Sequence, residues 1–198
     1  LVPMQAIDRI EVVRGPSSAL YGANAYLGVV NVIMRQGERI DGVELISSVG
    51  SVEGHLAYDL GLLYGERRGR TDYMVAARGQ FADRSGLRPT DLPGDSRYGD
   101  AGLASRNDVS RPASLYARAR VDGRTDERLI VDLSLQRLDS FGEFQDWGSL
   151  TGQNRVSMQN MFARARYERR VAGLNAALAA AYSRGDPTDD EFLATNQV

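Results

Sequence analysis

Apolar and polar side chains alternate along most of this chain with a period of two residues, and that alternation constrains its fold more than any other feature. In residues 114–121, apolar side chains on one face oppose Tyr116, Arg118 and Arg120 on the other. The segment 129–136 repeats the pattern. Because a period of two is the signature of a strand with two unlike faces, the chain is predicted to be all-β.

The alternation marks about seven predicted strands, whose connections alternate in length. Short polar joins fall at 66–70, 122–126 and 169–172. The joins at 83–111 and 140–156 are long and rich in Gly, Pro, Asp and Ser. Short turns on one rim and long loops on the other are typical of antiparallel transmembrane barrels, with the short turns in the periplasm. The predicted strands cover residues 43–49, 56–64, 73–81, 115–121, 129–135, 161–167 and 174–182.

The polar face of these strands is rich in arginine, which suggests an aqueous interior opposite an apolar exterior. An arginine-bearing face is equally expected of a solvated soluble sheet, so the pattern alone leaves both open. Aromatic residues near strand ends fit the interfacial girdles of a barrel. The predicted inner-face residues are Arg78, Arg118, Arg120, Asp132, Arg164 and Arg166, and the girdle residues are Tyr64, Tyr73, Phe81, Tyr167 and Tyr182.

The composition argues against several classes of protein and kinds of site. No segment approaches the roughly 20 apolar residues that a membrane helix needs, so any membrane span must consist of strands. The 24 basic and 26 acidic residues nearly cancel, which argues against a nucleic-acid partner. The absence of cysteine excludes disulfides, thiolate metal sites and cysteine nucleophiles.

Catalytic and metal-binding patterns have little support. His55 is the single histidine and has neither a cysteine nor a carboxylate at ligand spacing. Ser17 and Ser18 lack the strand-turn-helix context of a nucleophile elbow. The acidic residues in 186–191 do not have the spacing of a calcium loop. The chain is therefore expected to be no enzyme, to hold no metal and to need no cofactor.

A second feature precedes the alternating strands. Residues 8–22 read DRIEVVRGPSSALYG, and residues 28–33 read GVVNVI, so an apolar strand, a Gly-Pro break, a small-residue turn and another apolar strand follow one another. This stretch resembles the last part of the plug domain of TonB-dependent outer-membrane receptors. Leu27 stands where that family commonly has glycine.

The resemblance implies a domain division and a location. Residues 1–36 would be the C-terminal part of a small α+β plug domain. Residues 37–198 would be the N-terminal part of a transmembrane β-barrel, about seven strands of about twenty-two, which is wide enough to need a plug. The protein would lie in the outer membrane of a Gram-negative bacterium, in contact with outer-membrane lipid.

The resemblance also implies a function. It is energy-coupled uptake of a scarce, bulky nutrient, most often a ferric siderophore and otherwise cobalamin, haem or an oligosaccharide. The TonB complex would act through a segment upstream of Leu1, absent from this chain. A passive outer-membrane porin and a soluble β-sheet binding module remain alternatives, since both share the alternation. The porin has no reason to carry the segment around Arg14 and Tyr21, and a soluble module should distribute its long loops more evenly between the two rims.

Two sets of residues are candidates for function. Arg14 is the principal expectation for plug seating, because charged plug residues in this family commonly pair with inward-facing barrel charges. Aromatic and arginine side chains in the long joins could contact a bulky ligand, although those at 141–147 could instead extend the aromatic band. The plug and seating set is Glu11, Arg14, Gly15, Pro16, Tyr21, Gly22, Gly28 and Asn31, and the loop set is Tyr98, Arg106, Phe141, Phe144 and Trp147.

Overall fold

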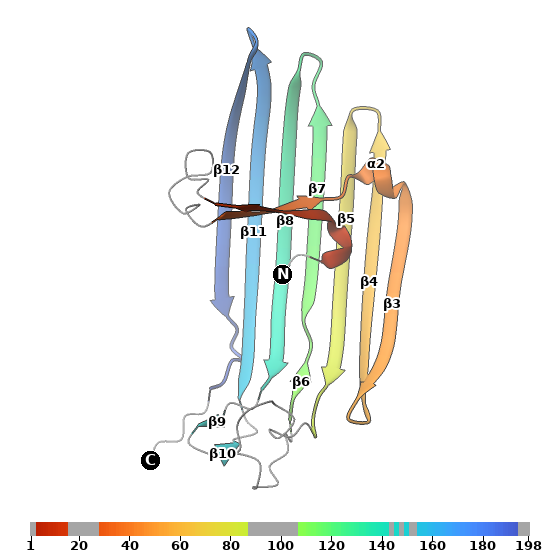
Figure 1. The fold of residues 1–198 in the computed structure, drawn as a ribbon, viewed down its shortest axis with the longest axis vertical. Helices are drawn as coiled ribbons and strands as arrows, with labels where there is room; N and C mark the ends of the chain where they lie inside the picture. The colour runs from red at the N-terminus through yellow and green to blue at the C-terminus, as the bar shows by residue number, and fades with distance from the viewer. Residues whose placement is uncertain are drawn as a thin grey trace.

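The fold is almost entirely antiparallel β-sheet, as predicted (Figure 1). A small hairpin at the start of the chain precedes one large sheet. No helix in the described part of the chain is long and apolar enough to cross a membrane. The computed structural model describes residues 3–15, 28–86, 107–142, 145–146, 149–150 and 154–193.

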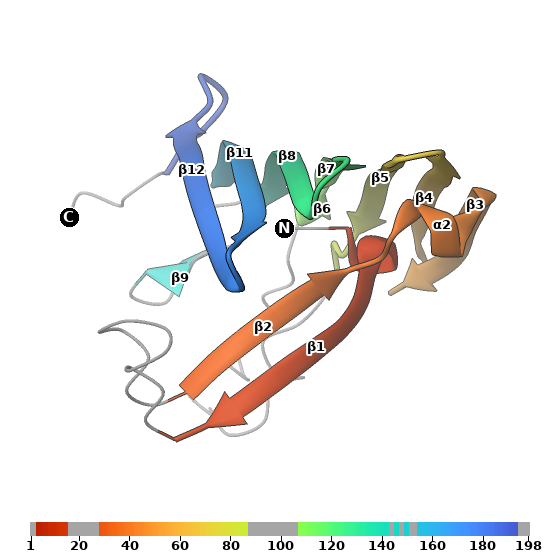
Figure 2. The same ribbon diagram turned by 90° about the horizontal axis from the view of Figure 1, so that it is seen from above.

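The hairpin forms its own two-stranded sheet, in which Ile10 lies opposite Val32 and Val12 opposite Val30. It crosses one face of the large sheet, as the two views of the ribbon show (Figures 1 and 2). These four apolar side chains share one side of the hairpin and are exposed. The hairpin elements are the 3-10 turn η1 (Met4–Ala6), β1 (Ile7–Arg14) and β2 (Gly28–Met34).

The large sheet is an antiparallel meander in which each long strand pairs with its neighbours in sequence. Its order is β12-β11-β8-β6-β5-β4-β3, and β7 lies between β5 and β8 beside the short β6. A one-turn helix, α2 (Gly37–Ile40), leads into the sheet. The strands are β3 (Gly42–Val52), β4 (His55–Arg68), β5 (Thr71–Asp83), β6 (Val109–Ser110), β7 (Ala113–Asp122), β8 (Glu127–Phe141), β11 (Arg155–Val171) and β12 (Leu174–Pro187), and a separate small ladder joins β9 (Gln145–Asp146) to β10 (Ser149–Leu150).

The tight turns are distributed as the lengths of the joins predicted. The turns that follow β4, β7 and β11 lie at one end of the sheet, and the long connections lie at the other (Figure 1). The β11–β12 turn has positive φ at both Ala172 (49°) and Gly173 (83°), which matches the twist of a two-residue hairpin. The turn after β3 is also short and lies at the end that carries the long connections.

One face of the large sheet is apolar from strand to strand, and we call it the outer face. The register places Leu115 opposite Leu135, and Leu133 opposite Ala163. Val49 and Leu178 are 78% and 76% exposed, whereas a soluble monomer seldom exposes a continuous apolar surface of this extent. Its exposed members include Val43, Leu45, Val49, Leu56, Leu60, Leu62, Val75, Leu115, Leu129, Leu133, Leu135, Met161, Tyr167, Leu174 and Leu178.

The opposite, inner face carries charges that are paired across strands. Asp132 is only 1% exposed and accepts hydrogen bonds from the Tyr116 hydroxyl (2.5 Å) and from Arg164 Nη2 (2.7 Å). Asp59 accepts a hydrogen bond from Arg78 Nε at 2.8 Å. Buried charges are stable only when they are paired, so these bridges let a polar surface pack closely. The predicted polar face is therefore present.

We expect the outer face to tolerate a charge much less well than the inner face does. In the protein that contains this chain, Leu133→Arg should destabilise the membrane-inserted state by about 2–4 kcal/mol, the cost of arginine on a lipid-facing barrel position. Ser183→Arg on the inner face of β12 should change it by less than about 1 kcal/mol. Equilibrium unfolding in lipid vesicles measures both, and equal effects would contradict the assignment of the faces.

Candidate functional site

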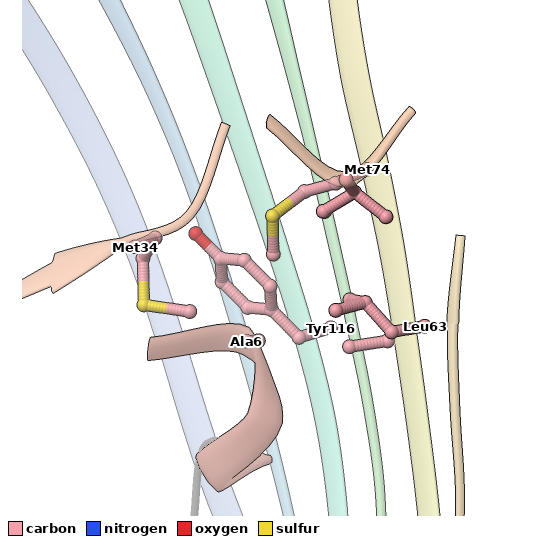
Figure 3. Packing of buried hydrophobic residues seen from close by; sticks show 7 residues of the cluster. Ala6, Met34, Leu63, Met74 and Tyr116 are labelled. Carbon is pink, nitrogen blue, oxygen red and sulfur yellow. The ribbon is translucent and has the colours of Figure 1, made fainter. Parts of the chain in front are cut away.

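The base of the hairpin docks on the inner face of the sheet through a small apolar core, which we call the docking site. Ala6 from η1 and Met34 from β2 pack against Leu63, Met74 and Tyr116 of the sheet (Figure 3). Ala6 and Leu63 are fully buried. Because most other large apolar side chains are exposed, this contact supplies much of the buried apolar surface of the described residues. The cluster comprises Ala6, Met34, Ile40, Leu63, Met74, Ala76 and Tyr116.

An ion pair borders this core. Arg35, the first residue after β2, donates hydrogen bonds to both carboxylate oxygens of Glu44 in β3, at 2.6 and 2.8 Å. Its backbone N–H also donates to the carbonyl of Ala6 at 2.9 Å. The hydrogen bond to Glu44 raises the pKa of Arg35, so the guanidinium remains charged. Bidentate pairs of this kind fix direction as well as distance, so they orient the hairpin on the sheet.

Asp72 of β5 binds the first turn of α2. Its Oδ1 accepts a hydrogen bond from the backbone N–H of Gly37 at 2.9 Å, and its Oδ2 accepts one from Glu38 at 2.8 Å. The first N–H groups of a helix have no partner within the helix, and a carboxylate near them is favourable. Asp72 is only 4% exposed, so the bonds form away from solvent. The short link between hairpin and sheet is thereby held to β5.

Glycine at two positions allows this link to approach the sheet closely. A Cβ atom on Gly37 would lie 2.1 Å from the carbonyl oxygen of Tyr73 and 2.7 Å from that of Glu66. A Cβ atom on Gly65 of β4 would lie 2.7 Å from Cδ1 of Ile40. No side chain fits at either distance, so backbone packs directly on backbone here.

Three further polar contacts cross the docking site. Gln5 Nε2 donates to the carbonyl of Ala77 at 3.0 Å. Arg120 Nη1 donates to Gln36 Oε1 at 3.2 Å. At its solvent edge, an arginine from the end of β4, Arg67, donates to Glu38 at 2.9 Å. Contacts from β3, β4, β5 and β7 thus converge on the residues between η1 and α2.

Comparison with known proteins finds similar sequences for parts of this chain. The family model "TonB-dependent Receptor Plug Domain" matches residues 1–29. An iron-regulated outer membrane virulence protein of Vibrio cholerae is 56% identical over 39 residues, 20% of this chain and 6% of that protein. The vitamin B12 transporter BtuB of Vibrio cholerae is 30% identical over 125 residues, 60% of this chain and 20% of that protein.

This chain is similar to the plug domain of TonB-dependent receptors over residues 1–29, and to the named outer-membrane and transport proteins over 39 and 125 residues. It is an outer-membrane protein of a Gram-negative bacterium, and its apolar outer face suits that location. BtuB of Vibrio vulnificus is also similar, with 42% identity over 50 residues, 25% of this chain and 8% of that transporter. The chain spans a fifth or less of the length of these relatives.

The structure places the predicted plug residues mainly in the hairpin, away from the docking site. Glu11 lies opposite Asn31, which donates a hydrogen bond to it at 3.3 Å. A stronger bond from Arg9 at 2.8 Å lowers the pKa of Glu11. Arg14 lies opposite Gly28 at the far end of the hairpin and forms no ion pair with the described residues. Its seating role stays a prediction.

The predicted turn residues are described only in part. Gly15 and Gly28 have φ values of +102° and +153°, and a Cβ atom on Gly28 would lie 2.6 Å from the carbonyl oxygen of Val13. Glycine is the residue that adopts such a backbone without strain. Pro16, Tyr21 and Gly22 lie outside the described residues.

Of the predicted ligand-facing loop residues, the structure describes Phe141. It ends β8, and the guanidinium of Arg155 lies 5.2 Å from the centre of its ring. Tyr98, Arg106, Phe144 and Trp147 lie outside the described residues.

The described part of the chain contains no group of three or more His, Cys, Asp and Glu side chains that could hold a metal ion. His55 Nδ1 lies 3.4 Å from Asp83 Oδ2, a partly exposed pair at the end of the sheet that carries the long connections.

Sequence reasoning missed the residues that hold the hairpin, namely Arg35, Glu44, Asp72 and Gln5. Alternation assigns Glu44 and Asp72 to the inner face. It cannot identify their partners, because those partners lie outside the strands, in the link where side chains do not alternate. One signal was available: Gly37 and Gly65 lack side chains at positions where nothing in a turn or strand requires glycine.

We expect Arg35 and Glu44 to be energetically coupled. In a double-mutant cycle with Arg35→Ala and Glu44→Ala, the coupling should be about 1 kcal/mol, above the usual value for exposed pairs because the geometry is bidentate. Arg9 and Glu11 provide a matched control within β1, and their coupling should be smaller because both side chains are exposed. Unfolding of the complete receptor measures both, and equal couplings would contradict a special role for Arg35.

We expect Gly37→Ala to displace α2 from the sheet. The added Cβ would collide with the carbonyl of Tyr73, so the docked state should lose about 1–3 kcal/mol, as in other overpacked sites. Gly50→Ala in β3 is the control, because its Cβ would meet no atom within 4 Å. Hydrogen exchange of the backbone N–H groups of Gly37 and Glu38 would report the change, and unaltered protection would contradict it.

Proposed function

We propose that this chain is part of a receptor that takes up a scarce, bulky nutrient across the outer membrane with energy supplied through TonB. The observation that carries the proposal is the docking of a plug hairpin on the inner face of a sheet whose outer face suits lipid. A passive porin has no need for a segment held in its lumen. A soluble binding module has no need for an apolar exterior.

A ferric siderophore is our favoured cargo, with cobalamin, haem and an oligosaccharide as the other candidates. The relatives support the first two, since one is named as iron-regulated and two as vitamin B12 transporters. We propose transport without enzymatic activity. The loop residues Tyr98, Arg106, Phe141, Phe144 and Trp147 are proposed to face the cargo.

We also propose the division of the chain into plug and barrel. Residues 1–36 would end the plug domain, and residues 37–198 would begin the barrel. In support, β2 ends at Met34, β3 begins at Gly42, and the link between them is held by Asp72. Arg14 is proposed to pair with inward-facing barrel charges outside the described residues.

Under this division, the docking site would attach the end of the plug to the barrel. The TonB complex is the proposed partner, acting through a segment outside this chain and therefore pulling on the plug from its far side. Arg35, Asp72 and the buried core would then anchor the C-terminal end of the plug to the barrel wall. Plug rearrangement can open a path without the plug leaving the barrel, because this end stays attached.

We expect removal of the hairpin to abolish energised uptake. A complete receptor lacking residues 7–34 should still reach the outer membrane, because the strands and their outer face are intact, but it should not couple uptake to the inner-membrane proton gradient. Uptake of radiolabelled iron from ferric siderophores, and of labelled cobalamin, with and without an uncoupler measures this.

The Gly50→Ala receptor serves as the control and should transport as the unaltered receptor does. Uptake by the unaltered receptor that is insensitive to the uncoupler would support a passive pore and overturn the proposal. Uptake of neither nutrient class under energised conditions would redirect the cargo assignment toward haem or glycans.

A further inference from the structure

The inner face of the sheet is hollowed over β3, β4 and β5, next to the docking site. We call this hollow, which has a volume of about 430 Å³, the lumenal recess. The register places Ala57 beside Ala82 across β4 and β5, and their small side chains leave the space open. The polar side chains that line the recess are Ser48, Asp59, Arg78, Gln80, Arg84 and Ser110.

The recess borders the docked end of the hairpin. Leu63 of the docking site and Asp59 share the inner face of β4, and Gly61 lies between them. A Cβ atom on Gly61 would lie 2.9 Å from Nε2 of Gln5, so η1 fills the space on that side. The strands continue past the hairpin toward the long connections (Figure 1). A molecule that enters from that end therefore reaches the recess before it reaches the docking site.

The charges of the recess are compensated locally. Asp59 accepts hydrogen bonds from Arg78 Nε at 2.8 Å and from the side-chain amide of Gln80. Arg78 Nη2 lies 2.6 Å from the same carboxylate oxygen. Arg84 Nη2 donates to Asp108 Oδ1 at 2.5 Å. Because each guanidinium group already has a carboxylate partner, an anion would have to compete with Asp59 and Asp108 for them.

The pair of Asp59 and Arg78 still has hydrogen-bonding groups to offer. The bonds that Asp59 accepts all go to Oδ2, and Oδ1 accepts none from the described residues. Arg78 uses Nε and Nη2 on Asp59, and its Nη1 donates to none of the described residues. The Asp59 side chain is only 12% exposed, so a further bond to it would form in partly desolvated surroundings. The pair therefore presents one acceptor and one donor to the lumen.

Uncharged amide and hydroxyl groups match this pattern. An amide donates through its N–H and accepts through its carbonyl, and a hydroxyl does both through one oxygen. Either group can bond to Asp59 and to Arg78 without separating them. A carboxylate or catecholate oxygen only accepts, so it would leave Oδ1 of Asp59 unsatisfied and would lie near a like charge.

We propose that the lumenal recess binds amide or hydroxyl groups of the cargo, and that the cargo has no net charge. The inference rests on the proposed function, because cargo on its way through the receptor is what enters the lumen. It divides the candidate cargoes into two classes. A ferric trihydroxamate, cobalamin and a neutral oligosaccharide have no net charge and present amide or hydroxyl groups. A ferric tricatecholate and haem carry negative charge.

Equilibrium binding to the complete receptor, purified in detergent and followed by titration calorimetry, tests this division. The neutral probes are a ferric trihydroxamate, cyanocobalamin and a maltooligosaccharide, and the anionic probes are a ferric tricatecholate and haem. One neutral probe should bind at least about tenfold more tightly than either anionic probe, because like charges in contact are costly. The neutral probe that binds identifies the source of the amide or hydroxyl groups. Binding of no neutral probe, or tighter binding of an anionic one, would overturn the proposal.

The variant Asp59→Asn tests the charge of the recess. It replaces a charged acceptor by a neutral one, so the neutral probe should bind about tenfold more weakly. It also leaves Arg78 without its carboxylate partner, so the preference for neutral over anionic probes should fall. Asp186→Asn is the matched control, because it removes the carboxylate partner of Arg184 on the outer face, and it should leave binding unchanged.

The variant Ala82→Leu tests the shape of the recess without altering its charge. The larger side chain should occupy the space between β4 and β5 and weaken binding of the neutral probe by on the order of tenfold. Ala181→Leu is the matched control, since Ala181 is exposed opposite Arg164 on the inner face of β12, outside the recess. An unaltered affinity in either Asp59→Asn or Ala82→Leu would overturn the recess as a binding site.

Uptake of labelled cargo, with and without an uncoupler, separates this proposal from the proposed function. Energised uptake by a receptor whose recess variants bind normally overturns the recess alone. Weakened binding in both recess variants, together with uptake that an uncoupler does not inhibit, supports the recess and overturns the energised transport alone.

Discussion

The attachment of a few residues between hairpin and sheet is the constraint on which the rest of this structure depends. Two parts of the chain meet there with little apolar surface of their own to bury, so the contact must be both close and directional. Gly37 provides closeness because it has no side chain, and the Asp72 carboxylate provides direction by accepting from two backbone N–H groups. The Arg35–Glu44 pair fixes the angle at which the hairpin leaves the sheet.

The two faces of the large sheet suit different surroundings, the outer face lipid and the inner face water. Its outer face buries almost nothing within the described chain, while its inner face neutralises charge locally, as Asp132 does between Tyr116, Arg118 and Arg164. A carboxylate shared in this way lets arginines remain on a lumen wall without leaving an unpaired charge buried. The arginines of the inner face are therefore structural where they meet aspartate.

Much of the fold follows from local pattern, whereas the docking site does not. Each strand reveals its two faces within about ten residues, so the alternation in 114–121 and 129–136 was enough to predict the strands and their orientation. The neighbour-to-neighbour pairing follows from the lengths of the joins. Glu44 and Arg35 lie in different elements, and their meeting depends on how the hairpin turns back over the sheet. Arg14 shows the converse, because the motif marks it although it forms no ion pair with the described residues.

The meander topology also has a consequence for the order in which the protein assembles. Every sheet residue of the docking site belongs to β3, β4, β5 or β7, the strands that follow the hairpin most closely in sequence. Contacts between nearby segments form with a smaller loop-closure cost than contacts between distant ones. The hairpin can therefore be captured by an early sheet before β8, β11 and β12 are added at its edge. If the barrel closes around a plug that is already attached to its first strands, the plug does not have to be inserted into a closed barrel afterwards.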